Sequence, residues 1–337
     1  MTNLNTGRIL VTGGAGFIGS AIVWALNRRG NSNILISDYL GRDEKWKNLV
    51  PLRFADYLEA DDLLKRLDSL GDFHAIFHLG ACSSTTETDA AYLIRNNFEY
   101  TKALAEFALA RGIRFVYASS AATYGEAAAE IPESVDLATL RPLNMYGYSK
   151  HLFDCYAERA GFLNRLTGIK YFNVFGPNEN HKGDMRSVVH KAFGQIAATG
   201  SARLFKSYRP EYADGEQCRD FLYVKDAVEA TLFLAENVDG GGLFNLGSGE
   251  PNTWNRLVDS IFRALHRPAR IEYVEMPETL RPKYQYFTRA NVAKLRAAGF
   301  ERPFTSLPDA VADYVQNYLV PGRYLGDEAN LETARRA

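Results

Sequence analysis

The stretch VTGGAGFIGSAIVWAL, residues 11–26, joins a short apolar run to the start of a helical pattern. Its glycines fit two overlapping spacings, Gly14-x-Gly16-x-x-Gly19 and Gly13-x-x-Gly16-x-x-Gly19. Glycine allows a tight turn and a close approach of the backbone to a pyrophosphate, and the N-terminus of a helix offers unpaired N–H groups. A strand, a glycine turn and a helix in this order predict a dinucleotide-binding turn, with Gly13, Gly16 and Gly19 as cofactor-binding residues.

Short apolar runs alternate with helical patterns through the first half of the chain. The runs cover residues 8–12, 33–38, 52–57, 74–80, 113–120 and 169–176, and the helical patterns lie near 17–30, 60–69, 89–111 and 146–162. Such alternation is typical of parallel strands joined by helices that cover both faces of a sheet. We therefore expect an α/β fold with a Rossmann-type doubly wound parallel sheet, and ligands at the carboxyl ends of its strands.

The alternation stops after residue 176. A loop-rich polar segment follows, with one helical pattern at 186–199, before an α/β pattern returns. The last third, with helices expected near 253–265 and 306–319 and a strand-like run at 270–277, is typical of an appended lobe. We predict a dinucleotide-binding Rossmann domain from 1–176 plus 225–248, a smaller C-terminal α/β substrate-binding lobe from 177–224 plus 249–320, and a mobile tail at 321–337.

The composition is that of a soluble globular protein and argues against several classes of function. The 337 residues include 39 basic and 40 acidic side chains, so the formal charge is −1 and no global positive field would attract nucleic acid or an anionic membrane. No apolar run approaches the roughly 18 residues that span a bilayer. The first residues lack the basic segment and long apolar segment of a secretion signal. We expect a cytoplasmic protein that binds neither nucleic acid nor membrane.

The spacing of cysteines and histidines argues against disulfides and metal sites. Cys82, Cys155 and Cys218 are odd in number, widely spaced and without a C-x-x-C pair, which fits a reducing compartment. His74 and His78 are four residues apart, but their apolar run predicts a strand rather than a helix. We therefore expect no metal ion.

Polar residues after the second, third and fourth runs would surround the adenosine end of the cofactor. Asp38 ends the second run, where a carboxylate accepts the free ribose 2′-hydroxyl of NAD and repels the 2′-phosphate of NADP. Lys45 is either a cation that offsets this repulsion or an exposed loop lysine, so the choice between NADP and NAD stays open. The other candidates around this end of the cofactor are Tyr39, Asp56, Tyr57, Leu79, Gly80, Ala81, Cys82 and Ser83.

The segment NMYGYSK, residues 144–150, carries the catalytic candidates. Tyr146 and Lys150 are four residues apart and would share one face of a helix. A neighbouring cation lowers the pKa of a phenol, so Tyr146 could take a proton from an alcohol while hydride leaves its carbon. Ser119 and Ser120 end the fifth apolar run, where a hydroxyl could hydrogen-bond the same substrate oxygen.

Five motifs in order, GGAGFIG, SSAATYG, YGYSK, YFNVFGP and RDFLYVKD, resemble the extended short-chain dehydrogenase/reductase family of nucleotide-sugar enzymes. The resemblance implies a tightly held nicotinamide cofactor, a nucleoside-diphosphate sugar as substrate, and a catalytic set of Ser120, Tyr146 and Lys150. A redox-inactive binding member would be expected to lose the tyrosine or the lysine, and this chain keeps both. Sugar 4,6-dehydratases carry an Asp-Glu pair where this chain has Ala121-Ala122-Thr123, which disfavours dehydration.

A narrower resemblance, from about residue 8 to 318, is to the ADP-glycero-manno-heptose 6-epimerases. It is carried by GACSSTTE (80–87), YASSAATYG (117–125), NMYGYSK, YFNVFGPNENHKGDM (171–185), RDFLYVKD and KYQYFT (283–288). It implies conversion of ADP-D-glycero-β-D-manno-heptose to ADP-L-glycero-β-D-manno-heptose, for lipopolysaccharide core synthesis, through a 6″-ketone with bound NADP(H). Taken alone, Lys182 would be a solvated loop charge. The resemblance makes it a second catalytic group, serving the epimer that Tyr146 does not serve.

The same resemblance assigns further contacts. Phe17, Ile18, Asn96 and Val174 would contact the cofactor, together with Tyr146 and Lys150. The substrate would contact Ser120, Asn173, Lys182, Asp184, Lys191, Phe205, Lys206, Ser207, Arg219 and Tyr284. Three positions depart from the family pattern: Asp184 stands where a serine is usual, Lys191 where some members have histidine, and Ala60 where a lysine is expected.

Family resemblance also implies a homo-oligomer, with a pentamer as the candidate assembly. Two other functions stay open at this point. One is epimerisation of another nucleotide sugar, as in the UDP-hexose 4-epimerases. The other, from a different class, is a catalytically inert scaffold that senses NAD(P) or a nucleotide sugar.

Overall fold

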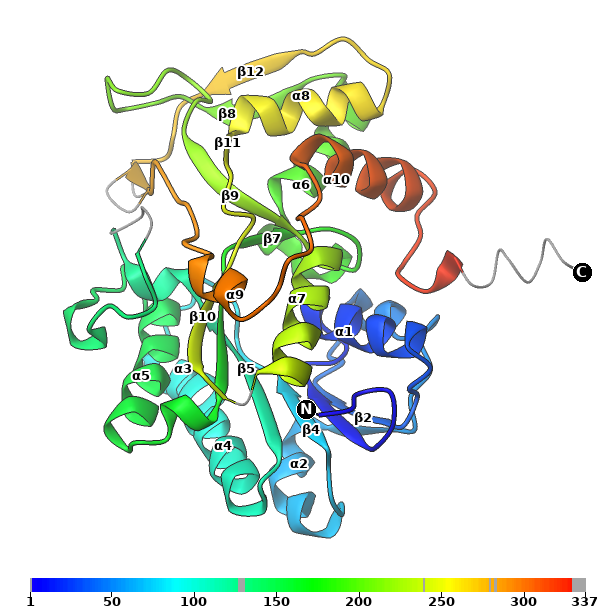
Figure 1. The fold of residues 1–337 in the computed structure, drawn as a ribbon. Coiled ribbons are helices and arrows are strands. Elements are labelled where there is room, and N and C mark those ends of the chain that lie inside the picture. Colours follow the sequence, from blue (N-terminus) through cyan, green and yellow to red (C-terminus); the bar gives the residue numbers. More distant parts are fainter. Residues whose placement is uncertain (1, 127–130, 239, 279, 282–283, 329–337) are drawn as a thin grey trace, which may run out of the picture.

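A seven-stranded sheet lies at the centre of the protein (Figure 1). The computed structural model describes residues 2–126, 131–238, 240–278, 280–281 and 284–328. The strand order is β10-β6-β5-β4-β1-β2-β3, and every neighbouring pair is parallel. This confirms the doubly wound α/β fold, whose strand order reverses between β1 and β4. The strands are β1 (Ile9–Thr12), β2 (Ile34–Asp38), β3 (Asp56–Glu59), β4 (Ala75–His78), β5 (Arg114–Ser120), β6 (Thr167–Tyr171) and β10 (Gly242–Leu246).

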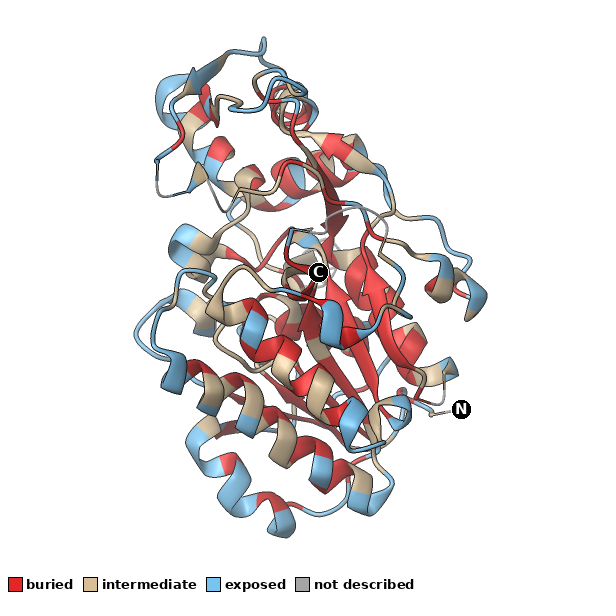
Figure 2. Ribbon diagram, turned by 90° about the vertical axis from the view of Figure 1, so that its left-hand side faces the viewer, coloured by how far each residue is buried: buried red, intermediate tan, exposed pale blue. Residues whose placement is uncertain are grey.

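Successive side chains of a strand point to opposite faces of the sheet, and here both faces are apolar. In β1, Ile9 and Val11 join the layer formed with α1 (Phe17–Arg28) and α7 (Val224–Asn237). Leu10 joins the opposite layer, which contains side chains of α2 (Ala60–Arg66), α4 (Tyr100–Arg111) and α5 (Met145–Arg159). Figure 2 shows the buried strands between helices with exposed outer surfaces. Because helices cover both faces of the sheet, ligands can bind only at the carboxyl ends of the strands.

A second group of elements lies beyond the carboxyl ends of the strands, at the top of Figure 1. It contains α6 (Val188–Thr199), α8 (Trp254–Ala264) and α10 (Leu307–Tyr314), of which α8 packs against the other two. Two small sheets belong to it, one with β12 (Ile271–Val274) beside β8 (Ala202–Phe205), the other with β9 (Cys218–Tyr223) between β11 (Pro251–Thr253) and β7 (Asn173–Phe175). By contrast, α9 (Ala293–Ala297) packs against β10 of the central sheet.

Short helical segments complete the connections. The α3 helix (Ala90–Leu93) leads into α4 through the π-helical η3 (Ile94–Glu99), and α10 continues into the π-helical η9 (Val315–Leu319). The 3₁₀ segments are η1 (Glu44–Asn48), η2 (Leu67–Ser69), η4 (Ala121–Tyr124), η5 (Leu137–Thr139), η6 (Leu163–Arg165) and η7 (Asn180–Met185). No helix among the described residues is long and apolar enough to cross a membrane.

Two strand predictions were wrong in their extent. The single strand expected at 169–176 is two strands, β6 in the central sheet and β7 in a small sheet. Between them the N–H of Phe172 donates to the carbonyl of Leu246 (3.0 Å), after which Asn173 pairs with Phe221 of β9. The strand expected at 52–57 is β3, which begins only at Asp56.

The C-terminal tail, expected to be mobile from residue 321, is packed against the protein in its first part. Leu325 is fully buried, and its N–H donates to the side-chain oxygen of Asn178 (3.0 Å). Residues 329–337 lie outside the described part of the chain. The structure therefore packs the tail as far as Leu325, and the mobility expected for 321–337 stays a prediction.

Candidate active site

A cavity of about 690 Å³ opens at the carboxyl ends of the central strands. Its walls come from the glycine turn, from the ends of β2, β4 and β5, from α5 and β7, and from η7. The expected site residues that line it are Gly13, Gly16, Phe17, Ile18, Gly19, Asp38, Lys45, Leu79, Gly80, Ala81, Cys82, Ser83, Ser120, Tyr146, Lys150, Asn173, Val174 and Lys182. The fold thus brings segments from residue 13 to residue 182 to one place.

The glycine turn is sterically restricted to glycine at two positions. Gly13 has φ = +67°, and a Cβ atom there would lie 2.6 Å from the backbone nitrogen of Gly80. A Cβ atom on Gly19 would lie 2.1 Å from the carbonyl oxygen of Gly13. The helix α1 begins directly after Gly16, so its first N–H groups face the turn. This cradle fits the pyrophosphate of a dinucleotide.

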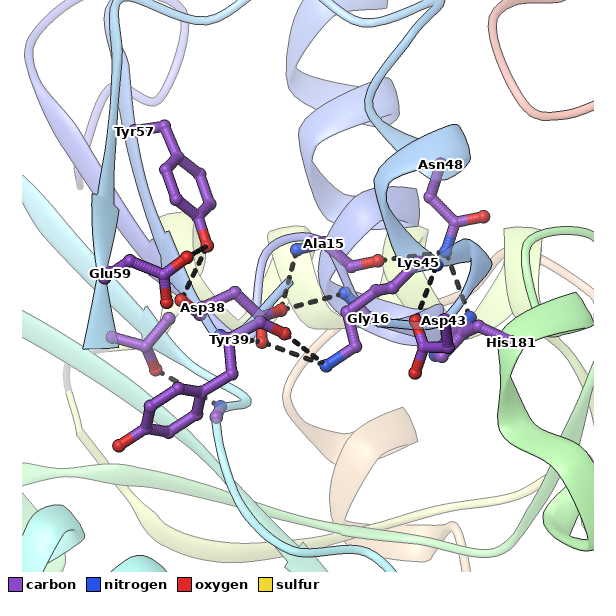
Figure 3. A network of polar contacts seen from close by, with 12 residues as sticks. Ala15, Gly16, Asp38, Tyr39, Asp43, Lys45, Asn48, Tyr57, Glu59 and His181 are labelled. Atoms are coloured by element: carbon purple, nitrogen blue, oxygen red, sulfur yellow. Dashed lines mark hydrogen bonds and ion pairs between the residues drawn. The ribbon is translucent and has the colours of Figure 1, made fainter. Parts of the chain in front are cut away.

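Asp38 and Lys45 form an ion pair at the end of β2 (Figure 3). One carboxylate oxygen of Asp38 accepts hydrogen bonds from the N–H groups of Ala15 (2.9 Å) and Gly16 (3.1 Å). The other accepts from Lys45 Nζ (3.2 Å), which also donates to the carbonyl of Tyr39 (2.9 Å). The carboxylate therefore meets a cation at the position where the ribose of a dinucleotide binds.

Tyr146 and Lys150 lie in the first turns of α5, which begins at the side-chain cap of Asn144. Burial raises the pKa of Tyr146, and a hydrogen bond with Ser120 lowers it by a smaller amount. Burial lowers the pKa of Lys150 to about 8, and its ammonium group donates to the carbonyl of Ala118 (2.8 Å). The expectation that a nearby cation lowers the pKa of Tyr146 is therefore wrong in this structure, because desolvation dominates.

The two serines at the end of β5 have different partners. Ser119 donates to the buried carboxylate of Asp154 (2.7 Å), which also pairs with the buried ammonium of Lys170 (3.1 Å). Ser120 accepts from the N–H of Ala122 (3.1 Å) and hydrogen-bonds Tyr146. Position at the end of the strand did not separate the two serines, whereas the family resemblance pointed to Ser120, and the structure places Ser120 beside the candidate acid or base.

Lys182 lies in η7, on another wall of the same cavity. Its ammonium group is 4.9 Å from the ring centre of Phe17, a cation–π contact. Burial lowers the pKa of Lys182, while the carboxylate of Glu179 raises it and Lys191 lowers it. The desolvation that a lysine needs in order to transfer protons near neutral pH is therefore present.

Asn97 is a functional candidate that the sequence did not reveal. Its amide accepts from the N–H of Cys82 (2.8 Å) and donates to the carbonyl of Cys82 (2.9 Å) and to Ser149 of α5 (2.9 Å). It therefore fixes the segment after β4 against the helix that carries Tyr146. The expected Asn96 does not line the cavity and donates instead to the carbonyl of Tyr92 (2.8 Å).

Several expected substrate residues lie outside the cavity wall, in the second group of elements. The guanidinium of Arg219 lies over the rings of Tyr284 (5.1 Å) and Trp254 (5.6 Å), and Trp254 donates to the hydroxyl of Tyr284 (2.9 Å). Trp254 itself lines the cavity and was not singled out from the sequence. The expected residues that do not line the cavity are Tyr39, Asp56, Tyr57, Asn96, Asp184, Lys191, Phe205, Lys206, Ser207, Arg219 and Tyr284.

Three of these outlying residues, Asp56, Asp184 and Lys191, make contacts of their own away from the cavity. Asp56 is the first residue of β3, at the strand end opposite to the cavity, and its side chain accepts from the N–H of Tyr57 (2.8 Å). Lys191 donates to the carbonyl of Asp184, which ties α6 to the loop that carries Lys182. Metal-ligating clusters are absent among the described residues. His78 instead lies between the hydroxyls of Thr12 (2.6 Å) and Thr101 (2.8 Å).

Residues 9–247 match the model of the NAD dependent epimerase/dehydratase family. The chain belongs to this family. Membership accounts for the glycine turn and implies a nicotinamide cofactor. Among curated relatives, an ADP-L-glycero-D-manno-heptose-6-epimerase of Nitratidesulfovibrio vulgaris is 52% identical over 314 residues, which are 92% of this chain and 97% of that protein. One from Fusobacterium nucleatum is 44% identical over 324 residues, covering 92% of this chain and 98% of that protein.

Solved structures of the family share the fold. The crystal structure of the Helicobacter pylori ADP-L-glycero-D-manno-heptose-6-epimerase has a TM-score of 0.79 at 26% identity and covers 93% of this chain and 96% of its own. The UDP-glucose 4-epimerase of Thermotoga maritima with UDP-glucose has a TM-score of 0.77 at 26% identity, covering 93% and 99%. The fold is thus shared by epimerases of different sugars, and the discrimination between them lies in the site residues.

Proposed function

We propose that the protein is an epimerase that inverts C6″ of ADP-D-glycero-β-D-manno-heptose to give ADP-L-glycero-β-D-manno-heptose, for the heptose of lipopolysaccharide core. The observation that carries the proposal is the presence of two proton-transfer groups, Tyr146 and Lys182, on different walls of one cavity. A plain dehydrogenase needs only one such group. The names of the relatives at 44–52% identity supply the sugar.

The protonation states of the two groups suit a transfer in opposite directions. Burial shifts both pKa values towards the neutral forms, a phenol that can give a proton and an amine that can take one. When bound, a nicotinamide cofactor would supply reversible hydride transfer at C6″. Lys182 takes the proton of the C6″ hydroxyl as the hydride leaves, which produces a 6″-ketone. After the ketone has turned its other face to the cofactor, Tyr146 protonates the oxygen as hydride returns.

We propose NADP as the cofactor, with NAD as the alternative. Lys45 lies beside Asp38, so the negative carboxylate is offset by an ammonium group where a 2′-phosphate would bind. The experiment is mass spectrometry of the cofactor released when the purified protein is denatured. Release of NAD alone would contradict the assignment.

The second group of elements would hold the remainder of the nucleotide sugar. We propose that residues 177–224 and 249–320 form this substrate-binding lobe, and that 1–176 and 225–248 hold the cofactor. Arg219 lies between two aromatic rings and would bind the pyrophosphate by charge-assisted hydrogen bonds. A cytoplasmic homo-oligomer, with a pentamer as the candidate, belongs to the same proposal.

One assay tests the function. The protein is incubated with ADP-D-glycero-β-D-manno-heptose, and the L-glycero epimer is followed by NMR, with UDP-glucose in a parallel sample. Formation of the L-glycero epimer alone supports the proposal. Turnover of UDP-glucose without turnover of the heptose would favour a UDP-hexose 4-epimerase, and cofactor binding without any turnover would favour a sensing scaffold.

A further inference from the structure

The 3₁₀ segment η1 places one buried amide between two loops of the active site. Asn48 is 1% exposed, and its Nδ2 atom donates to the carbonyl of Ala15 (2.9 Å) in the glycine turn. The same atom donates to the carbonyl of Asn178 (3.0 Å) and lies 3.3 Å from Nδ1 of His181. Figure 3 shows the Asn48 side chain pointing towards Ala15 and His181. One amide nitrogen thus connects the turn expected to hold the cofactor pyrophosphate with the loop that carries Lys182.

The hydrogen bonds of the Asn48 side chain are made by its amide nitrogen and not by its amide oxygen. Its Oδ1 atom is buried and has no hydrogen-bond partner among the described residues, which is unfavourable by itself. The two hydrogens of Nδ2 serve the carbonyls of Ala15 and Asn178, so the approach to His181 Nδ1 at 3.3 Å is a third and weaker contact. Burial, with Lys45 as a further cause, lowers the pKa of His181 to about 4, so the ring that meets the amide is neutral at pH 7. A side chain with the same shape but without N–H donors would lose this connection between the two loops.

The loop has a second anchor on the same side. Asn178 has a positive φ of 76° and donates from Nδ2 to the hydroxyl of Ser20 in α1 (2.9 Å). Its own carbonyl is the acceptor that Asn48 uses. The contacts of Asn178 and of His181 restrain the backbone from residue 178 to residue 181, and Lys182 is the next residue. The position of the lysine is therefore set by the helix and turn of the cofactor site.

Among the residues that the structure describes, no hydrogen bond joins Tyr146 to η1 in this way. Its helix begins at the cap of Asn144, and its neighbour Lys150 is fixed by the carbonyl of Ala118 (2.8 Å). The segment after β4 is fixed to α5 through Asn97 and Ser149 (2.9 Å). The two proton-transfer groups are thus held by separate sets of contacts.

We propose that Asn48 is a positioning residue for Lys182. It holds the loop that carries Lys182 against the glycine turn and thereby keeps the lysine within reach of the sugar. The inference rests on the proposed function, because it assumes that Lys182 transfers a proton. It implies that loss of the amide impairs the half of the reaction that depends on Lys182 and spares the half that depends on Tyr146. A merely structural role would weaken both halves alike.

The experiment compares Asn48→Ala with Asn31→Ala, a matched control. Asn31 is also a buried amide (3% exposed) that donates to two carbonyls, those of Leu4 (2.8 Å) and Gly7 (3.2 Å), but it lies at the amino ends of β1 and β2. Each heptose epimer is mixed rapidly with the cofactor-loaded enzyme, and formation of reduced nicotinamide is followed by absorbance. Lys182→Met in the same assay identifies the epimer whose oxidation needs the lysine.

We expect Asn48→Ala to slow oxidation of that epimer by about 100-fold, as a displacement of about 1 Å can do. Oxidation of the other epimer should stay near the wild-type rate, and Asn31→Ala should resemble wild type with both. Cofactor affinity, measured by titration calorimetry, should change little, because Asp38 still holds the N–H groups of Ala15 and Gly16. Equal slowing of both epimers by Asn48→Ala would overturn the proposal.

A second measurement does not depend on turnover. The rate at which an amine-modifying reagent labels Lys182 is measured by mass spectrometry, with the exposed Lys65 of α2 as internal reference. Release of the loop should speed labelling of Lys182 in Asn48→Ala and in Asn48→Asp, relative to wild type. A wild-type protein that turns over neither epimer would refute the heptose assignment alone. The labelling rate of Lys182 would then be the test of positioning by Asn48. A rate that is unchanged in both Asn48→Ala and Asn48→Asp would overturn the proposal.

Discussion

At the scale of single residues, desolvation is the largest cause of the pKa shifts of the candidate catalytic groups. It raises the pKa of Tyr146 and lowers those of Lys150 and Lys182. Nearby charges modify these shifts without reversing them. A phenol and an amine whose pKa values are both shifted towards the neutral forms can exchange protons with a sugar hydroxyl.

Substitution of each proton-transfer group should separate the two halves of the reaction. We expect Tyr146→Phe and Lys182→Met each to slow epimerisation by about 10²–10⁴-fold, the usual contribution of general acid–base catalysis. Each variant should still process one stereochemical half of a suitable aldehyde analogue, because the other group is intact. NMR of the products gives both results. Wild-type activity in Lys182→Met would return this lysine to the class of solvated loop charges.

Lys45 should set the choice of cofactor. A charge-assisted hydrogen bond contributes about 1.5–3 kcal/mol, so Lys45→Ala should weaken NADP binding by roughly 10- to 100-fold and leave NAD binding nearly unchanged. Calorimetric titration of the cofactor-free protein with each dinucleotide measures both affinities. Lys47→Ala is the control, since Lys47 pairs with Glu44 at the surface (2.5 Å). Equal losses for both dinucleotides would argue against a bond to the 2′-phosphate.

Some residues of the site could be predicted because their signal is local. Tyr146 and Lys150 follow from one helical turn, and the glycines of the turn follow from one strand–helix junction. Asn97 could not be told from Asn96, because a π-helical segment changes which side of a helix each residue faces. Trp254 is brought to the cavity by a long-range contact that no local pattern encodes.

At the scale of elements, replacement of a glycine by alanine should have opposite effects on stability in the glycine turn and in helix α6. Gly19→Ala should destabilise the protein by about 1–3 kcal/mol and weaken cofactor binding, because a Cβ atom would lie 2.1 Å from the carbonyl oxygen of Gly13. Gly194→Ala, at an exposed position of α6 with nothing within 4 Å of the new Cβ, should stabilise it by roughly 0.5–1 kcal/mol. Urea unfolding measures both, and a harmless Gly19→Ala would contradict the close approach.

The elements could be predicted from periodicity where one environment extends along the whole segment. Each of the six apolar runs overlaps a strand of the central sheet, and the helical patterns between them were confirmed as α1, α2, α4 and α5. The run at 169–176 is uniformly apolar, yet its two halves pair with different sheets. Hydrophobicity reports that a residue is buried and does not report its pairing partner, so this break could not be predicted.

At the scale of the whole molecule, the buried ammonium of Lys150 makes stability depend on pH. Its pKa is lowered from 10.5 to about 8 in the folded protein, so between these values the unfolded chain binds more protons. Stability should therefore rise with pH across this window. The free energy of unfolding of wild type minus that of Lys150→Met, measured in urea at several pH values, should increase from about pH 8 to 10.5. A difference that stays constant would contradict burial of this charge.

The packed part of the C-terminal tail has a consequence for handling the protein. Leu325 sits in the interior and donates to Asn178, which belongs to the loop that carries Lys182. A protease cut shortly before Leu325 would remove this contact with Asn178 and leave every strand of the central sheet in place. Clipped preparations should then keep their circular dichroism spectrum and lose epimerase activity. Intact mass is therefore the appropriate quality check before a weak preparation is called inactive, and purification tags are better attached at the N-terminus.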